Sequence, residues 1–297
     1  MKYITVTLNP AIDLSYTLSE PFEVGRLNRA SRPCEISYSG KGINVSREFI
    51  RLGIDSKVLC LLGEEDAEEM TSALRGDHLN LFSVMTPGRI RRNVSAVGPD
   101  GRCVEINEPG GEIELEDVLR FFSLYDKVIN EPGEKTVVIS GSAPPGFRDD
   151  IYKRLVIAAK KTGAFVILDA DGDLLEKGVE GGPDLITPNG KEISSLTGTE
   201  LKGEGGELRL SALAQAAYVY EKCGVAVLCT LGENGSVFAG EEGRFICEAK
   251  SAEIKRFKGA GDFYLARYLY ERIERGRDVP GAMKIASEET ASYLEEE

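Results

Sequence analysis

The sequence predicts an α/β protein in which a mostly parallel central sheet is covered by helices on both faces. Two observations carry this prediction. From residue 114 onward, short apolar runs alternate with amphipathic stretches, which is the order of strands and helices in a parallel sheet. In residues 12–38 and 89–107, apolar and polar residues alternate between turns, as in antiparallel strands. We therefore expect residues 1–297 to form one domain with a small second sheet, assembled from these two insertions.

Each element of the main sheet is predicted from its own local pattern. Apolar runs typical of buried strands cover residues 2–8, 56–62, 136–140, 165–169, 184–187 and 226–231. Apolar residues recur with helical spacing in 43–53, 64–75, 114–130, 149–163, 210–223 and 263–273, and a further helix is expected from residue 190. A last hairpin is predicted over 236–249, and the acidic end at 295–297 is expected to be a solvated tail.

Composition excludes several classes of function. The net charge of −13 argues against a nucleic-acid or anionic-membrane partner, because either surface would repel the protein. No apolar run approaches the roughly 18 residues that a membrane span requires. The six cysteines include no CxxC pair and the only histidine is His78, so a zinc site is not expected. Together with an N-terminus that lacks a signal peptide, this predicts a cytoplasmic protein.

Polar, glycine-containing segments follow four of the predicted strands. They cover residues 140–146, 169–172, 187–192 and 230–235. Each alone is explained by an ordinary turn, because Gly, Pro, Asn and Asp dominate turns. Ligands of open parallel sheets, however, bind beyond the carboxyl ends of the strands. Their occurrence at successive strand ends therefore favours a binding site at that edge.

The turn at Gly259–Asp262 opens the helical run that follows it. Its two glycines allow a ligand to approach the backbone closely, and the unpaired N–H groups of a helix N-terminus favour an anion. Asp262 in this first turn has two interpretations: a general base that accepts a proton from an attacking hydroxyl, or an ordinary helix cap. The turn alone does not decide between them.

Two common nucleotide signatures are absent from the sequence. No GxGxxG follows the first strand, and Gly190-Lys191 is followed by Glu192 instead of the Ser or Thr of a phosphate-binding P-loop. The phosphates of a bound nucleotide would therefore need a different binding segment, and the turn at 259–262 is the candidate.

Seven motifs along the chain resemble those of the ribokinase-like carbohydrate kinases, the PfkB family, in order and spacing. They are TLNPAID (7–13), GKGINVSR (40–47), RRNV (91–94), SGSAPPG (140–146), TPNGKE (187–192), TLGENG (230–235) and GAGD (259–262). The first motif and the EIN-x-PG stretch at 105–110 look most like the branch containing 1-phosphofructokinase and tagatose-6-phosphate kinase. The resemblance implies a ribokinase-like fold with a small β-sheet lid, which in this family often pairs subunits into a homodimer.

The resemblance also implies an activity, ATP-dependent phosphorylation of a phosphorylated ketohexose with Mg²⁺. Fructose 1-phosphate is the first candidate acceptor, and fructose 6-phosphate and tagatose 6-phosphate are the others. Asp262 would be the general base, and the N–H groups of Gly259, Ala260 and Gly261 would stabilise the transferring phosphoryl group. The resemblance also implies which residues would bind the sugar phosphate, the nucleotide and Mg²⁺. The sugar phosphate would contact Asp13, Gly40, Lys41, Asn44, Arg91 and Asn107; the nucleotide would contact Asn189, Thr230, Gly232 and Gly235; and Glu192 would hold Mg²⁺ through water.

Some of these residues also have purely structural interpretations. Lys41 is a solvated residue at a helix start in one reading, although a cation there opposes the helix dipole. Glu192 is explained equally well as dipole compensation in a first helical turn. Arg91 and Arg92 are neighbours in a predicted strand, so they must face opposite sides, and placing Arg91 inward follows from the resemblance alone.

Several positions depart from the pattern of the family. They are Ser39, Asp171, Phe257, Phe263 and Arg267, where glycine, small or hydroxyl-bearing residues are usual. Bulky groups on both sides of the turn at 259–262 are expected to narrow the nucleotide pocket or to re-aim the helix. This leaves a second hypothesis open, a catalytically weak or inactive relative that binds a sugar phosphate or nucleotide as a sensor or partner.

Overall fold

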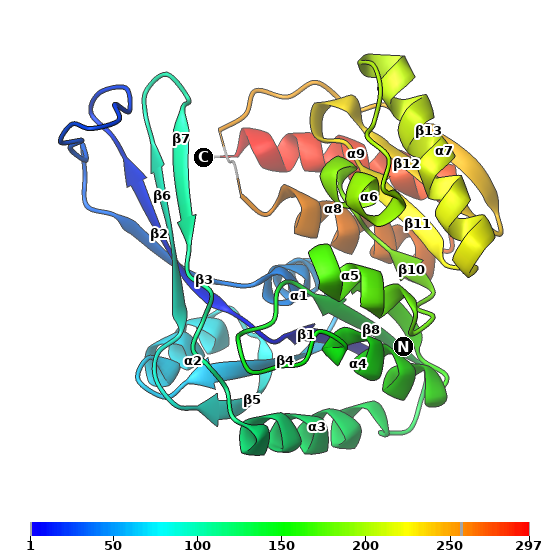
Figure 1. The fold of residues 1–297 in the computed structure, drawn as a ribbon, viewed down its shortest axis with the longest axis horizontal. Coiled ribbons are helices and arrows are strands. Elements are labelled where there is room, and N and C mark those ends of the chain that lie inside the picture. Colours follow the sequence, from blue (N-terminus) through cyan, green and yellow to red (C-terminus); the bar gives the residue numbers. More distant parts are fainter. Residues whose placement is uncertain (1, 256–257, 297) are drawn as a thin grey trace.

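The computed structural model describes residues 2–255 and 258–296, and over these residues its main layer is a nine-stranded sheet (Figure 1). The strand order is β13-β12-β11-β10-β9-β8-β1-β4-β5. The strands are β1 (Lys2–Thr7), β4 (Ser56–Gly63), β5 (Asn80–Thr86), β8 (Lys135–Ser140), β9 (Phe165–Asp169), β10 (Leu185–Ile186), β11 (Ala226–Thr230), β12 (Ser236–Gly240) and β13 (Gly243–Cys247). Neighbours from β5 to β11 pair in parallel, and β12 and β13 add an antiparallel edge. The predicted mostly parallel sheet is confirmed.

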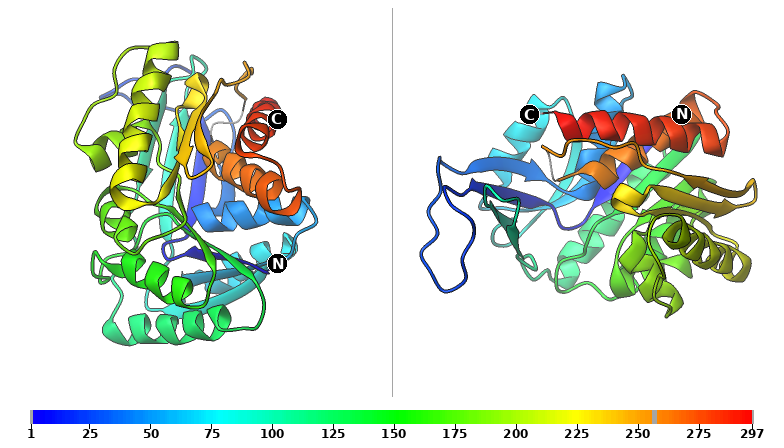
Figure 2. Two further views of the ribbon diagram at one scale, coloured as in Figure 1. Left: turned by 90° about the vertical axis from the view of Figure 1, so that its right-hand side faces the viewer. Right: turned by 90° about the horizontal axis from the view of Figure 1, so that it is seen from above.

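Helices cover both faces of this sheet, as Figure 2 shows. They are α1 (Lys41–Arg51), α2 (Ala67–Gly76), α3 (Leu115–Ile129), α4 (Ile151–Lys161), α5 (Gly172–Val179), α6 (Gly190–Thr197), α7 (Gly205–Cys223), α8 (Ala260–Leu269) and α9 (Val279–Glu295). One face carries α3 to α7, and the other carries α1, α2, α8 and α9. In the described part of the chain, every helix is too short or too polar to cross a bilayer.

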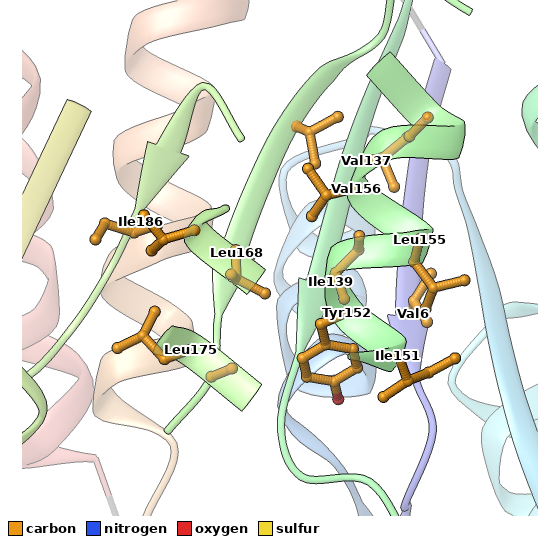
Figure 3. Packing of buried hydrophobic residues seen from close by; sticks show 14 of the residues in the cluster. Val6, Val137, Ile139, Ile151, Tyr152, Leu155, Val156, Leu168, Leu175 and Ile186 are labelled. Carbon is orange, nitrogen blue, oxygen red and sulfur yellow. The ribbon is translucent and has the colours of Figure 1, made fainter. Parts of the chain in front are cut away.

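The alternation of side chains along each strand builds a core on both faces. In β8, Val137 and Ile139 pack against α4, where Leu155 and Val156 meet them (Figure 3). Val138, between them, is fully buried on the opposite face with residues of α1, α8 and α9. Because both faces are buried, the strands read as continuous apolar runs, and this is why the sequence predicted them well.

The small sheet stands to one side of the main sheet, and in the described residues it has four strands in the order β3-β2-β6-β7 (Figure 1). They are β2 (Ala11–Thr17), β3 (Glu35–Ser39), β6 (Arg91–Val97) and β7 (Cys103–Asn107). Both predicted insertions contribute one antiparallel pair each, and β2 joins β6 in parallel. The sequence did not predict this parallel joint, because it depends on contacts between segments about 80 residues apart.

Some elements differ from the predictions. The edge strand β5 and the short helix α5 were not predicted, because β5 is only half buried and α5 is eight residues long with two glycines. Helix α7 begins at Gly205, five residues before the predicted start, because the two glycines there resemble a turn. The acidic end is helical as far as Glu295, which ends α9 and accepts a hydrogen bond from the Glu253 N–H, while Glu295 and Glu296 are exposed, as expected for a solvated end. The assignment of the whole chain to one domain stays a prediction.

The direction in which the chain crosses the sheet reverses between β1 and β8, so this is a topological switch point. From β1 the chain moves outward through β4 to β5, whereas from β8 it moves the other way through β9, β10 and β11. Loops at the carboxyl ends of β1 and β8 therefore diverge, and ligands of open α/β sheets bind at such a switch point.

Candidate active site

The N-terminus of α1 lies over the carboxyl ends of β1 and β8. A Cβ on Gly42 would lie 2.6 Å from Thr7 Oγ1 and 3.1 Å from Ser140 Oγ, and one on Gly40 would lie 2.5 Å from Thr7 Cγ2. Glycine at both positions is therefore required for this close approach. The packing brings the first turn of α1, with Lys41 and Asn44, to the switch point of the sheet.

The N-terminus of α8 meets the same place from the other side. We call Gly259–Asp262 the glycine turn; Gly259 has a φ of 83° and precedes the first residue of α8. Two helix N-termini, those of α1 and α8, thus converge, and both favour an anion in the space between them. The Asn44 side chain joins them, because its Nδ2 donates to Asp262 Oδ2 at 2.7 Å.

Asp262 does not act as a helix cap. Within the described residues, α8 has no side-chain cap hydrogen bond, whereas α3 and α6 each have a complete capping box. The carboxylate turns instead toward Asn44 and is 8% exposed. The structural interpretation of Asp262 left open by the sequence is therefore not supported by the geometry.

The surroundings of Asp262 favour its protonated form. Burial, followed by the negative charge of Asp169, raises the pKa of this carboxyl to about 7. The Asn44 hydrogen bond and the charge of Lys41 act in the opposite direction. A carboxyl with a pKa near neutrality can accept and release a proton at physiological pH, which is the requirement for a general base.

Lys41 is paired with Asp169, a residue to which the sequence assigned no role. Lys41 Nζ lies 3.1 Å from Asp169 Oδ1, and the Lys41 side chain is 39% exposed. The Asp169 carboxylate raises the pKa of Lys41, so the lysine stays charged. The cation at the start of α1 is thus partly balanced by a carboxylate at the end of β9. The available signal was an aspartate directly at the carboxyl end of an apolar strand.

Two cavities meet at the glycine turn. The smaller, about 280 Å³, lies over the ends of the parallel strands and is lined by Lys41, Asp169, Thr187, Asn189, Glu192, Leu228, Thr230, Gly259, Gly261, Asp262, Tyr264 and Leu265. The larger, about 970 Å³, lies between α1, the end of α9 and the polar face of the small sheet. Gly259 borders both cavities. A group held at this turn could therefore face both spaces.

The predicted site residues divide between these cavities. Lys41, Asn189, Glu192, Thr230, Gly259, Gly261 and Asp262 line the smaller cavity, and Asp13 and Asn44 line the larger one. Gly40, Arg91, Asn107, Ala260, Gly232 and Gly235 line neither. Close packing explains why glycine stands at position 235, because a Cβ there would lie 2.0 Å from the carbonyl oxygen of Cys247. Asn107 is exposed and pairs in register with Asn93.

Asp13 is held by two neighbours on the small sheet. Ser39 Oγ donates to Asp13 Oδ2 at 2.5 Å, and Asn93 Nδ2 donates to Asp13 Oδ1 at 2.9 Å. Asp13 is 8% exposed, so both hydrogen bonds offset the cost of burying its charge. Ser39, which differs from the residue usual in the family, therefore supplies a hydroxyl donor to Asp13.

Arg91 and Arg92 face opposite sides of β6. Arg91 Nε donates to the carbonyl of Asn9 at 3.1 Å, and burial lowers the pKa of its guanidinium. The negative charges of Asp13 and Asp171 act in the opposite direction on this pKa. Arg92 instead pairs with Asp66 at 2.7 Å on the other side. Register places Arg91 on the same face of the small sheet as Asp13, but it lines neither cavity, so its role as a phosphate clamp stays a prediction.

Asn189 and Glu192 form the capping box of α6. Asn189 Oδ1 accepts from the N–H groups of Lys191 and Glu192, and Glu192 Oε2 accepts from the Asn189 N–H at 2.8 Å. Desolvation raises the pKa of the Glu192 carboxyl. Among the residues described, no group of three or more His, Cys, Asp or Glu side chains could hold a metal by itself. A hydrated Mg²⁺ fits this donor set only with phosphate oxygens and water as its remaining ligands.

The bulky residues after the glycine turn do not enter the smaller cavity. Phe263 borders the larger cavity and stacks on Tyr293, and Arg267 forms ion pairs with Glu48 and Glu289. Neither Phe263 nor Arg267 therefore narrows the smaller cavity, and the other expectation, a re-aimed helix, stays a prediction. Phe257 lies outside the described residues.

Sequence reasoning also missed Thr187 and Tyr264. Thr187 lines the smaller cavity, and its Oγ1 is buried with no hydrogen-bond partner in the described part of the chain. Such an atom is available to a ligand or to water. Tyr264, the second residue after Asp262, lines the same cavity, and its hydroxyl lies 2.7 Å from Ser236 Oγ. Thr187 stood in a strand-end segment, but no spacing singled it out.

Known proteins of one family match nearly the whole length of this chain. The family model described as pfkB family carbohydrate kinase matches residues 6–292. A 1-phosphofructokinase of Bacillus subtilis (strain 168) is 31% identical over 265 residues, which are 89% of this chain and 84% of that protein. Its name describes an activity of that relative.

Solved structures share the fold. A possible 1-phosphofructokinase of Thermotoga maritima has a TM-score of 0.86 at 28% identity and covers 100% of this chain and 92% of its own. Escherichia coli phosphofructokinase-2, solved in complex with fructose-6-phosphate, has a TM-score of 0.86 at 22% identity and covers 99% and 93%. At that identity the second likeness shows the fold alone. Both confirm the predicted fold class.

Proposed function

We propose, from the premise that this chain belongs to the pfkB family of carbohydrate kinases, that it transfers a phosphoryl group from ATP to a hydroxyl of a phosphorylated ketohexose. Fructose 1-phosphate is the first candidate acceptor, because relatives named 1-phosphofructokinase match most of the chain. One observation carries the catalytic part of the proposal: a buried carboxylate with a raised pKa lies at the N-terminus of α8, where both cavities meet.

The two cavities give the reactants separate places. The acceptor would occupy the larger cavity, where Asp13 and Asn44 can bind its hydroxyl groups. ATP would approach from the smaller cavity, past Thr230 and Asn189, so that its γ-phosphate reaches the glycine turn. Gly232 and Gly235, in the segment that follows β11, would border the nucleotide from outside this lining. Lys41, which lines the smaller cavity, would meet the acceptor at the border with that cavity, and Arg91 and Asn107, which line neither cavity, would have to turn toward the sugar phosphate when it binds.

Phosphoryl transfer then needs one proton movement and one displacement. Asp262 accepts the proton of the attacking hydroxyl while that oxygen forms a bond to the γ-phosphorus. The bond between the γ-phosphorus and the bridging oxygen breaks, and ADP leaves with the electron pair. The backbone N–H groups of Gly259, Ala260 and Gly261 stabilise the charge on the transferring group, since such reactions depend mainly on positioning and electrostatics.

Mg²⁺ belongs to this proposal as the ion that neutralises charge on the ATP phosphates when bound. Glu192 would hold it through water, because Oε2 of this carboxylate already accepts the Asn189 N–H. Binding a cation there would also oppose the effect of burial, which raises the pKa of Glu192.

An ADP-release assay tests the function. We expect turnover with ATP and Mg²⁺ on one of fructose 1-phosphate, fructose 6-phosphate and tagatose 6-phosphate, with fructose 1-phosphate giving the highest kcat/KM. Unphosphorylated fructose is the control acceptor and should be poor, because it offers nothing to the cations at Lys41 and Arg91. Measurable binding of these sugar phosphates without any ADP release would instead support a sensor or partner role.

We further propose that the small sheet pairs two copies of the chain. Register places Leu14, Ile36, Val94 and Ile106 in one row across the four strands, on the face opposite Asp13. Ile36 is 54% exposed and Ile106 is 60% exposed. A row of two exposed and two half-buried apolar side chains, on a sheet whose other face borders the larger cavity, fits an interface with a second copy.

Light scattering during gel filtration tests this pairing. Wild type should elute with twice the mass of the chain, and Ile36→Glu with Ile106→Glu should elute with the mass of a single chain, because buried carboxylates oppose the interface. Leu119→Glu is the matched control, since Leu119 on α3 is 61% exposed and lies outside the sheet. A monomeric wild type would contradict the proposal.

A cytoplasmic location completes the proposal. Cys60 and Cys229 are fully buried, and burial raises the pKa of each thiol to about 12. Such thiols behave as small apolar side chains, in keeping with a reducing compartment.

A further inference from the structure

The last turn of α9 touches the glycine turn at both of its ends. Tyr293 Oη donates to the carbonyl oxygen of Lys258 at 3.2 Å, directly before the turn. The Tyr293 ring stacks on Phe263, directly after the turn, with centroids 4.3 Å apart and an interplanar angle of 26°. Helices α8 and α9 lie side by side in both views (Figures 1 and 2). One side chain from α9 therefore contacts the entrance and the exit of the turn.

The hydrogen bond to Lys258 fixes an N–H group of the turn. A peptide unit is planar and trans, so its C=O and N–H groups point in opposite directions. Holding the Lys258 carbonyl on Tyr293 therefore sets the direction of the Gly259 N–H, which belongs to the same peptide. Gly259 also fits against this hydroxyl, because a Cβ on it would lie 3.0 Å from Tyr293 Oη.

Further contacts hold Phe263 and the preceding loop. The Arg267 guanidinium lies 5.2 Å from the centroid of the Phe263 ring and is 2.7 Å from Glu48 Oε1 and 2.9 Å from Glu289 Oε2. The Glu48 side chain is 3% exposed, so Arg267, together with Arg51 at 3.5 Å from Glu48 Oε2, compensates a buried charge. The Lys255 N–H also donates to the Leu294 carbonyl at 2.8 Å. Two departures from the family pattern, Phe263 and Arg267, thus belong to one layer that attaches α9 to the turn.

We propose that Tyr293 is a positioning residue for phosphoryl transfer: it orients the peptide between Lys258 and Gly259 so that the N–H of the glycine turn faces the transferring group. The effect on turnover rests on the proposed function, whereas the effect on the turn itself does not. A purely structural role would instead lower stability and leave kcat of the folded protein unchanged.

Tyr293→Phe tests this proposal, because it removes the hydroxyl and keeps the stacked ring. We expect kcat to fall about 2- to 13-fold, the equivalent of one net hydrogen bond, while KM for ATP and for the sugar phosphate stays within twofold. The matched control is Tyr125→Phe. Tyr125 Oη also donates to a backbone carbonyl, that of Leu155 at 2.9 Å, in the core and away from the site. That variant should lose thermal stability and keep its kcat.

Amide hydrogen exchange gives a second readout that needs no activity. In Tyr293→Phe, the amides of residues 259–263 should exchange at least about threefold faster than in wild type, and in Tyr125→Phe they should not change. If wild type releases no ADP with any acceptor, the proposed function fails and hydrogen exchange still decides the role of Tyr293. A Tyr293→Phe variant with kcat within twofold of wild type and unchanged exchange at 259–263 would overturn the inference.

Discussion

Replacing Asp262 by Asn is expected to lower kcat by about 10²- to 10⁴-fold, the usual range for loss of a positioned general base. The substitution keeps the size of the side chain and can still accept the hydrogen bond from Asn44 Nδ2. It removes the proton-accepting carboxylate oxygen that the proposed mechanism requires. Steady-state ADP release at saturating ATP and sugar phosphate measures the effect.

The thermal stability of the Asp262→Asn variant should not fall with its kcat. Because burial raises the pKa of Asp262 from 3.8 to about 7, the folded state binds the proton more tightly than the unfolded chain does. This contribution to stability is complete below pH 4 and is lost as the pH rises to 7, so ionised Asp262 destabilises the fold at pH 8. The Asn variant should therefore unfold at the same or a higher temperature than wild type at pH 8.

A matched control and a pH profile separate catalysis from folding. Asp117→Asn changes another buried aspartate in the first turn of a helix, but Asp117 completes a capping box. That variant should lose stability and keep kcat. For wild type, kcat/KM should fall about tenfold per unit of pH below 7, as Asp262 becomes protonated. An Asp262→Asn enzyme with kcat within threefold of wild type would remove Asp262 from the mechanism.

The main sheet could be predicted from the sequence because its strands are buried on both faces. Such strands appear as apolar runs whatever their neighbours are, as Val137, Val138 and Ile139 show. Edge elements lack this signal, since β5 alternates between half-buried and exposed positions. The parallel joint between β2 and β6 needed knowledge of contacts that no local pattern contains.

The candidate site was predictable where a motif coincides with a strand end or a helix start. Lys41, Asn44 and Asp262 were singled out in this way, and the structure brings them together. Asp169 and Tyr293 were not given roles, because their importance comes from partners distant in the sequence: Lys41 for Asp169, and Lys258 for Tyr293. A contact between two residues that are distant in the sequence produces no periodic pattern in the sequence, so it cannot be predicted from one.

Replacing Lys41 by Met is expected to lower kcat/KM by about 10²- to 10³-fold, the range seen when one group that stabilises the transferring charge is removed. Three effects act together. Phosphate oxygens lose a cation at the N-terminus of α1, Asp169 is left as an unpaired carboxylate that is 10% exposed, and Asp262 loses a positive charge that lowers its pKa. The acid limb of the pH profile should therefore move to higher pH as kcat/KM falls.

Two further variants decide which of these effects dominates. Lys177→Met is the matched control, because Lys177 is 40% exposed, pairs with Asp149 at 2.8 Å and lies outside both cavities; its kcat/KM should stay within twofold. Adding Asp169→Asn to Lys41→Met removes the unpaired carboxylate and a charge that raises the pKa of Asp262. If the cation binds phosphate, the double variant should recover the pH profile and not the turnover. Full recovery of kcat/KM would mean that Lys41 serves only to neutralise Asp169.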